Sequence, residues 1–349
     1  MSLEAKGNGQ RRREKEFMLN KFKGCLIGCA VGDAIGAPVE AQKGEVCQAY
    51  IENNVRPQLF LFVKRNQGNH SFGQYTDDTQ LTRELALSLA EKKEFDPEDY
   101  AKRLVSLFRD TIVVGYGKAT KQSVVRLSRG SSWRTSGEKP PAAGNGSAMR
   151  VAPIGLFYQD TEKLSQAAHY QGIMTHSDPR CSAGAVAIAG AVHFSSRLNE
   201  DPSFWWHKLS NLVLHFDKEL ARNIFLLETM VNDTLEIALK KVQKMSDSSF
   251  RETRWEGISP YVVPSVLWSL YSFLRTPHDF METICTSIWP GGDVDTTAAM
   301  AGAISGAFNG LESIPENIAR EINDHGKWGY EELCGLAEKL YQASEKNPE

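Results

Sequence analysis

Residues 24–36 read GCLIGCAVGDAIG and place a glycine at every fourth position. In a helix, glycines with this spacing lie on one face, where a second helix can approach closely. Glycine lowers helix stability, so its repetition needs a packing reason. The same spacing recurs at Gly302, Gly306 and Gly310. The two stretches predict a tightly packed central pair of helices.

The rest of the chain is also mostly helical in pattern. Residues 76–92 carry leucines at i, i+4 and i+8, the pattern of a helix with one apolar face. Residues 160–171 begin with acidic residues that are typical of a helix start, and residues 262–274 are apolar enough for a buried helix. The best strand candidate is the short run 59–63, which fits a buried apolar turn equally well. Residues 128–143 form a loop rich in Ser, Gly and Pro. We therefore predict one all-α domain over residues 17–345.

The bulk composition is that of a folded protein without a strong charge bias. The chain has 349 residues, of which 41% are hydrophobic and 24% charged, and its formal net charge is -3. A sizeable core is possible, and no nucleic-acid or membrane partner is expected. Residues 1–16 are predicted as a polar, basic tail or a frayed helix start, with the run Arg11-Arg12-Arg13 as a solvated face or a partner-binding arm.

Six cysteines are spread along the chain without a CxxC pair, which predicts buried free thiols. The Ala- and Gly-rich segments 24–37, 183–194 and 298–310 each fall short of the ~20 residues that a membrane-spanning helix needs. The N-terminus is polar and shows no signal peptide. Together with the free thiols, this favours a cytoplasmic location.

Two separated clusters combine carboxylates with hydroxyls at predicted helix starts. Residues 76–79 read TDDT, and residues 291–297 read GGDVDTT. Helix capping explains Thr76 and one aspartate, but adjacent carboxylates repel each other unless a cation offsets their charge. Mg²⁺ and Mn²⁺ prefer such oxygen ligands, and the lack of a nearby His or Cys argues against zinc. The pair of clusters predicts a shared two-metal site that activates water.

Five blocks in order give the chain a resemblance to a known family. They are GCLIGCAVGDAIGAPVE at 24–40, YTDDT at 75–79, GNGSAMR at 144–150, THSDP at 175–179, and GGDVDTT at 291–297. Over roughly residues 20–312 the sequence resembles the ADP-ribosylglycohydrolases, which are related to the dinitrogenase-reductase-activating glycohydrolase. The resemblance implies a compact, single-domain orthogonal helix bundle with two Mg²⁺ or Mn²⁺ ions in a cleft.

The same resemblance assigns residues to roles. The implied metal ligands are Thr76, Asp77, Asp78, Asp293, Asp295 and Thr296. Glu40 matches a mobile glutamate near the metals and, with Asp77 and Asp295, is a candidate catalytic residue. The implied substrate-binding residues are Gly117, Asn145, Gly146, Ser147, Met149, His176 and Ser177. Asp33 is expected either to orient the ligands or to be a helix-packing carboxylate.

The resemblance implies hydrolysis of the bond between ADP-ribose and a protein side chain, through an oxocarbenium-like transition state. Arginine is the preferred acceptor, because the blocks look closer to the bacterial glycohydrolase branch. The alternatives are a serine-linked or O-acetyl-ADP-ribose hydrolase, and an immunity protein that neutralises a toxin ADP-ribosyltransferase by binding and by hydrolysis. A metal-dependent phosphoesterase fits the aspartates but not the other blocks. The expected partner is an ADP-ribosylated protein.

Overall fold

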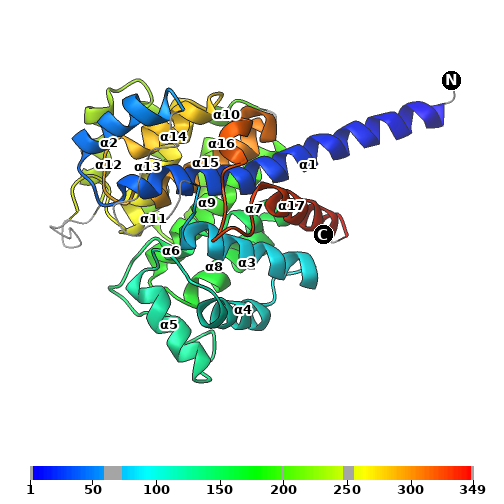
Figure 1. Ribbon diagram of the computed structural model, residues 1–349, viewed down its shortest axis with the longest axis horizontal. Helices are drawn as coiled ribbons and strands as arrows, with labels where there is room; N and C mark the ends of the chain where they lie inside the picture. The colour runs from blue at the N-terminus through cyan, green and yellow to red at the C-terminus, as the bar shows by residue number, and fades with distance from the viewer. Residues whose placement is uncertain (1–2, 59–72, 199, 247–254, 347–349) are drawn as a thin grey trace.

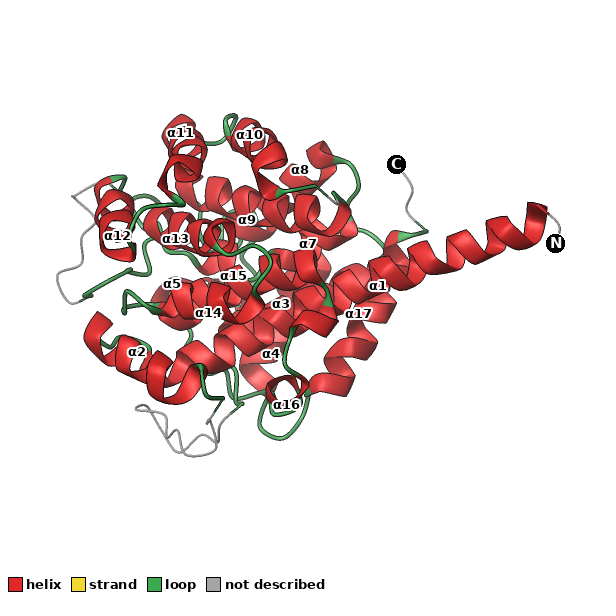
Figure 2. Ribbon diagram, turned by 90° about the horizontal axis from the view of Figure 1, so that it is seen from above, coloured by secondary structure: helices red, strands yellow, loops and turns green. Residues whose placement is uncertain are grey.

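The computed structural model describes residues 3–58, 73–198, 200–246 and 255–346. Within these ranges the regular secondary structure is helical, and β pairing is limited to isolated bridges such as that between Lys43 and Gly291. Figures 1 and 2 show the helices gathered around a common centre and crossing at steep angles. The prediction of an all-α bundle is confirmed, while the strand candidate at 59–63 lies outside the described residues.

Seventeen α-helices follow one another in the described part of the chain. Their bounds are α1 (Leu3–Gly36), α2 (Gly44–Tyr50), α3 (Asp77–Lys92), α4 (Pro97–Asp110), α5 (Lys118–Ser128), α6 (Gly146–Met149), α7 (Ala152–Phe157), α8 (Thr161–Ile173), α9 (Pro179–Arg197), α10 (Pro202–Val213), α11 (Lys218–Leu227), α12 (Leu235–Lys244), α13 (Val262–Arg275), α14 (Phe280–Ile288), α15 (Val294–Asn309), α16 (Glu316–Ala319) and α17 (Tyr330–Ser344).

The glycine stripes pack α1 directly against α15. A Cβ added to Gly24 would lie 2.3 Å from the carbonyl oxygen of Gly306, and one added to Gly28 would lie 2.3 Å from that of Gly302. At Gly32 the distance to the carbonyl oxygen of Ala298 would be 2.1 Å. These separations are far below van der Waals contact, so only glycine allows the two backbones to approach this closely. The predicted central helix pair is confirmed.

Replacing Gly32 with alanine is expected to destabilise the protein by about 1–3 kcal/mol, because the new methyl group forces two backbones apart in a packed core. Urea unfolding of the metal-saturated protein measures the change. Gly335 provides the control, since it lies inside α17 and a Cβ there meets nothing within 4 Å. Gly335→Ala is expected to stabilise the protein by up to about 1 kcal/mol through helix propensity. Equal effects at the two positions would contradict the close-packing explanation.

The helix pair also brings the functional segments together. Gly36 ends α1 against Asp295, whose Cα would lie 2.5 Å from a Cβ at Gly36. Asp33 lies one turn earlier and is fully buried. The first turns of α3 and α15 therefore both lie beside the C-terminal end of α1.

The first part of α1 extends away from the body of the protein (Figure 1). Residues 3–16, which we predicted as a tail or frayed helix start, belong to this helix, and side chains 10–17 are exposed. Within the stretch Gln10–Val39, an 18-residue window has a mean hydropathy of 1.3, enough for a membrane span, but 94% of that window is buried within the protein. That burial is the pattern of a core helix. All six cysteines are buried and free, as predicted.

Candidate active site

The two acidic clusters meet at the starts of α3 and α15. Thr76 is the N-cap of α3, and Asp293 is the N-cap of α15. The hydroxyl of Thr296 lies 3.4 Å from Asp78 Oδ2 and 3.2 Å from Asp293 Oδ1, so it bridges segments 218 residues apart. Val294, which stands between the two aspartates of this cluster, is fully buried in the core. The six residues proposed as metal ligands thus lie in one buried region.

Asp33 on α1 organises the start of α3. Its carboxylate accepts hydrogen bonds from the backbone N–H of Thr76, at 2.9 and 3.0 Å, and from that of Thr79, at 3.1 Å. The two threonine hydroxyls also donate to it, at 2.9 Å from Thr76 and 2.6 Å from Thr79. Asp33 therefore satisfies helix N–H groups from a different helix and holds the TDDT segment in place.

The carboxylates form two groups with the spacing of metal ligands. Oxygens of Asp33, Asp78 and Asp295 lie within 4.8 Å of one another, and so do oxygens of Glu40, Asp293 and Asp295. Asp295 belongs to both groups, which is the arrangement of a bridging ligand. Asp78 Oδ1 is buried and has no hydrogen-bond partner among the described residues. A buried carboxylate oxygen without a partner is costly, and a cation would satisfy it.

Backbone hydrogen bonds hold the segment of Glu40 against the loop that carries Asp293, the next member of the second group. The N–H of Ala41 donates to the carbonyl of Gly292 at 2.8 Å, and the N–H of Gly292 donates to the carbonyl of Gln42 at 2.9 Å. Ala41 adopts a left-handed conformation, with φ of 61°. The backbone around Glu40 is therefore attached to the loop that leads into Asp293, although the resemblance matched Glu40 to a mobile residue.

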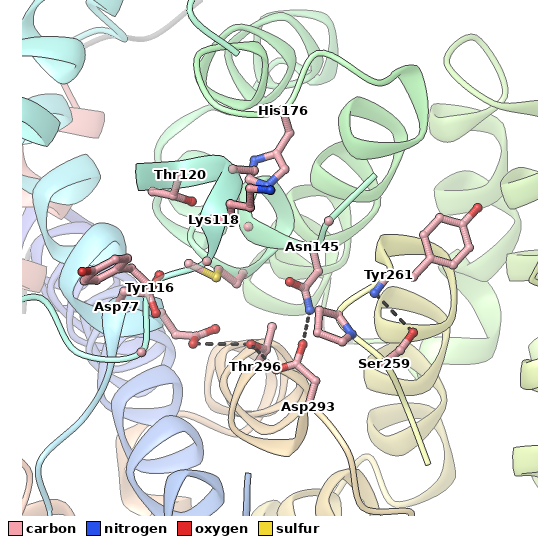
Figure 3. A pocket seen from close by; sticks show the side chains of 18 of the residues that line it. Asp77, Tyr116, Lys118, Thr120, Asn145, His176, Ser259, Tyr261, Asp293 and Thr296 are labelled. Carbon is pink, nitrogen blue, oxygen red and sulfur yellow. Dashed lines mark hydrogen bonds between the residues drawn. The ribbon is translucent and has the colours of Figure 1, made fainter. Parts of the chain in front are cut away.

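A cavity of about 630 Å³ opens over the carboxylates. Figure 3 shows Asp77, Asp293 and Thr296 on one wall and His176 on the opposite wall. Of the predicted substrate-binding residues, five line it: Gly117, Asn145, Gly146, Met149 and His176. Asn145 also contacts the acidic wall, because its amide nitrogen donates to Asp293 Oδ2 at 2.6 Å.

Two predicted substrate contacts lie outside the cavity lining. The hydroxyl of Ser147 is buried and donates to the carbonyl of Cys181 at 2.9 Å. The hydroxyl of Ser177 donates to the carbonyl of Ile173 at 3.4 Å. Both side chains therefore bond to neighbouring backbone instead of facing the cavity. Thr76 is also absent from the lining, since it is fully buried between Asp33 and Asp78.

Sequence reasoning missed two parts of the cavity wall. The start of α5 contributes Lys118 and Thr120, and the segment before α13 contributes Trp255, Ser259 and Tyr261. Gly117, which the resemblance assigned to the substrate site, directly precedes the first part. The second part carries no motif, because it is held by backbone hydrogen bonds to loops far away in the sequence. The N–H of Asn145 donates to the carbonyl of Pro260 at 2.9 Å, and the N–H of Ile258 donates to the carbonyl of Gly291 at 3.0 Å.

The sequence profile of the ADP-ribosylglycohydrolase family matches residues 14–349, nearly the whole chain. The chain belongs to the ADP-ribosylglycohydrolase family. It is therefore an ADP-ribosyl glycohydrolase, a hydrolase that acts on glycosidic bonds.

Similar proteins come from archaea, animals and bacteria. An uncharacterized protein of Archaeoglobus fulgidus is 33% identical over 93% of this chain and 97% of its own length. The ADP-ribosylhydrolase ARH3 of Bos taurus is 30% identical over 94% of each chain. The ADP-ribosyl-[dinitrogen reductase] glycohydrolase of Rhodospirillum rubrum is 27% identical over 86% of this chain and 89% of its own.

A solved structure titled "ADP-ribosylglycohydrolase-related protein complex" superposes with a TM-score of 0.71. The two sequences are 24% identical, and the match covers 94% of this chain and 99% of the other. At this identity the likeness shows the shared fold.

The carboxylates of this ADP-ribosylglycohydrolase repel one another strongly without a cation. Burial raises the pKa of Asp78 well above its ordinary value, and neighbouring aspartates raise it further. Burial and the charge of Glu40 raise the pKa of Asp295 in the same direction. Oxygen ligands with excess negative charge suit Mg²⁺ or Mn²⁺, so these residues fit the metal dependence of the family.

The metal-free protein is expected to lose stability as the pH rises from about 4 to 7. The buried carboxyl of Asp78 has a higher pKa in the folded chain than in the unfolded chain, where it is about 3.9. Its contribution to stability is therefore fully present below about pH 3.9, and it is lost as the pH rises through the folded pKa. Asp78→Asn removes one of the charges. In EDTA it should flatten the fall of stability with pH, and at pH 7 Mg²⁺ should raise its melting temperature less than that of the wild type. An identical pH profile for both proteins would contradict this explanation.

Proposed function

We propose that this protein removes ADP-ribose from modified protein side chains by hydrolysis assisted by two divalent cations, Mg²⁺ or Mn²⁺. The observation that carries the proposal is Asp78 Oδ1, a buried and unpartnered carboxylate oxygen in a cluster that opens on a cavity of about 630 Å³. One cation would be held by Asp78 and Asp295 and the other by Asp293 and Asp295, with Asp77, Thr76 and Thr296 completing the set.

The side chains around the cluster have separable tasks in this proposal. Bound cations would supply positive charge that orients the ribose hydroxyls and lowers the pKa of water. Glu40 lines the cavity and is half-buried, which supports a role as the group that would accept a proton from the attacking water. Asn145 holds Asp293 through its amide group and keeps that carboxylate directed at the cluster. Asp77, Asp78 and Asp295 are the other carboxylates that line the cavity.

Two observations bear on the acceptor side chain. The arginine preference was based on closeness to the bacterial branch, yet the identity is 30% with the Bos taurus ARH3 and 27% with the Rhodospirillum rubrum enzyme. Lys118 also lines the cavity. Its positive charge repels a cationic guanidinium group but does not repel the neutral O-glycosidic linkage to serine. These observations favour an O-linked acceptor such as serine over the arginine linkage that we expected.

Peptides carrying ADP-ribose on a defined serine or arginine test the linkage in the presence of Mg²⁺. We expect faster release from serine. Lys118→Ala should raise the arginine-to-serine rate ratio, by about threefold for a partly screened charge at the entrance. Lys102→Ala, an exposed lysine on α4, is the control and should leave the ratio unchanged. Release from arginine alone would reject the O-linked proposal and restore the arginine linkage.

A further inference from the structure

His176 lies on the wall of the cavity opposite the aspartates (Figure 3). One of its ring nitrogens bonds to its neighbour in the chain. Nδ1 of His176 lies 2.8 Å from the hydroxyl oxygen of Thr175. Which atom donates depends on the tautomer of the ring. The surroundings of Thr175 decide this question.

Arg150 fixes one side of the Thr175 hydroxyl. Its guanidinium is fully buried and donates four hydrogen bonds, all to neutral oxygens. One of them runs from Nη2 to Thr175 Oγ1 at 2.7 Å. The others reach Gln171 and the carbonyl of Gly146, so the guanidinium is held on several sides. An arginine cannot accept a hydrogen bond, so Thr175 Oγ1 is the acceptor in this contact.

The single hydrogen of the Thr175 hydroxyl has two acceptors in reach. The carbonyl of Gly172 is 3.4 Å away, a long distance for an O–H···O bond. That carbonyl already accepts the backbone N–H groups of Thr175, at 3.1 Å, and His176, at 2.9 Å, which occupy both of its lone pairs. His176 Nδ1 is much closer, at 2.8 Å. The hydrogen therefore points to Nδ1, and Nδ1 accepts.

We propose that Arg150 and Thr175 form a relay that holds His176 as the tautomer with its proton on Nε2, so that Nε2–H is a fixed hydrogen-bond donor to an oxygen of the bound nucleotide. Arg150 and Thr175 are positioning residues in this scheme, because they act through the ring. The choice of a nucleotide as the ligand rests on the proposed function. The tautomer itself does not.

The loop beside the ring agrees with a fixed orientation. A Cβ at Gly144 or Gly146 would lie 3.2 Å from His176 Nε2, and at Gly146 it would also lie 2.6 Å from Cε1. Both glycines therefore leave room for the ring edge that carries Nε2. None of the described residues accepts a hydrogen bond from Nε2, which leaves that donor for a ligand in the cavity. Burial and the charge of Arg150 lower the pKa of His176 to about 3, so the ring stays neutral at physiological pH.

Nuclear magnetic resonance of ¹⁵N-histidine-labelled, Mg²⁺-loaded protein tests the relay. The chain has 8 histidines, and His176→Gln identifies the signal of interest. In the wild type we expect Nε2 protonated and Nδ1 unprotonated. Thr175→Val removes the hydroxyl and should move protonation toward Nδ1, whereas Thr175→Ser should restore the wild-type pattern. Protonated Nδ1 in the wild type, or an unchanged pattern in Thr175→Val, would overturn the relay. The wild-type spectrum decides even if the valine variant fails to fold.

Calorimetric measurement of ADP-ribose binding tests whether Nε2–H of His176 donates a hydrogen bond to the ligand. Thr175→Val should weaken binding by roughly threefold to tenfold, the effect of losing one neutral hydrogen bond, and Thr175→Ser should not. A shifted tautomer with undiminished affinity would reject the role of Nε2–H in binding. If ADP-ribose does not bind the wild type at all, the proposed function fails, while the spectrum still reports on the relay.

Discussion

Asp295→Asn is expected to lower kcat by at least about a thousandfold, a loss of about 4 kcal/mol in transition-state stabilisation. Among the described residues, Asp295 is the carboxylate that belongs to both groups, so its replacement should weaken both proposed cation positions. Steady-state release of ADP-ribose at saturating Mg²⁺ measures the effect. Because the asparagine keeps the shape and removes a charge from a repulsive cluster, the variant should fold at least as stably as the wild type without metal.

Asp217→Asn is the matched control for this variant. Asp217 also stands at a helix start, as the N-cap of α11, but it is outside the cavity lining. Its replacement should leave kcat within about twofold, because asparagine caps helices as well as aspartate. Full activity in Asp295→Asn would refute its place in the metal cluster.

Asp33→Ala is expected to destabilise the Mg²⁺-saturated protein by about 3 kcal/mol and to abolish measurable activity. The change leaves the N–H groups of Thr76 and Thr79 and the Thr79 hydroxyl without their acceptor, and each buried unsatisfied donor costs about 1–3 kcal/mol. Removal of one negative charge also reduces the repulsion within the cluster, which would raise the stability. This gain is small when cations already neutralise the cluster, so the lost hydrogen bonds should decide the change in stability.

Urea unfolding at saturating Mg²⁺ measures the stability of Asp33→Ala. The control is Asp201→Ala, which removes an exposed N-cap of α10 that bonds only within its own helix start. It should cost about 1 kcal/mol and leave activity intact. A loss at Asp33 no larger than that at Asp201 would show that Asp33 does not hold α3 in place.

The sequence predicted the parts of the fold that depend on local pattern. The glycine spacing identified the α1–α15 pair, because a four-residue repeat has one physical explanation in a buried helix. The helices α3 and α13 matched predicted ranges through their capping and apolar patterns. The extension of α1 back to Leu3 was harder to predict, because a charged, exposed segment carries no apolar periodicity.

The sequence did not predict which side chains face the cavity, because their direction depends on tertiary contacts. Acidic residues next to helix starts were visible in the sequence, but the direction of a short side chain was not. Ser147 and Ser177 stand inside motifs and yet bond to backbone away from the cavity. Arg150 closes one of those motifs, and its role became visible only through its four buried hydrogen bonds. Trp255 and Tyr261 line the cavity from a segment that carries no motif.

The most direct test of the metal-assisted hydrolysis is the release of ADP-ribose from a modified protein by the wild-type chain, before and after removal of divalent cations. Mass spectrometry identifies the product. The proposed function predicts intact ADP-ribose, loss of release in EDTA, and recovery when Mg²⁺ or Mn²⁺ is restored. Undiminished release in EDTA, or AMP as the product, would contradict it.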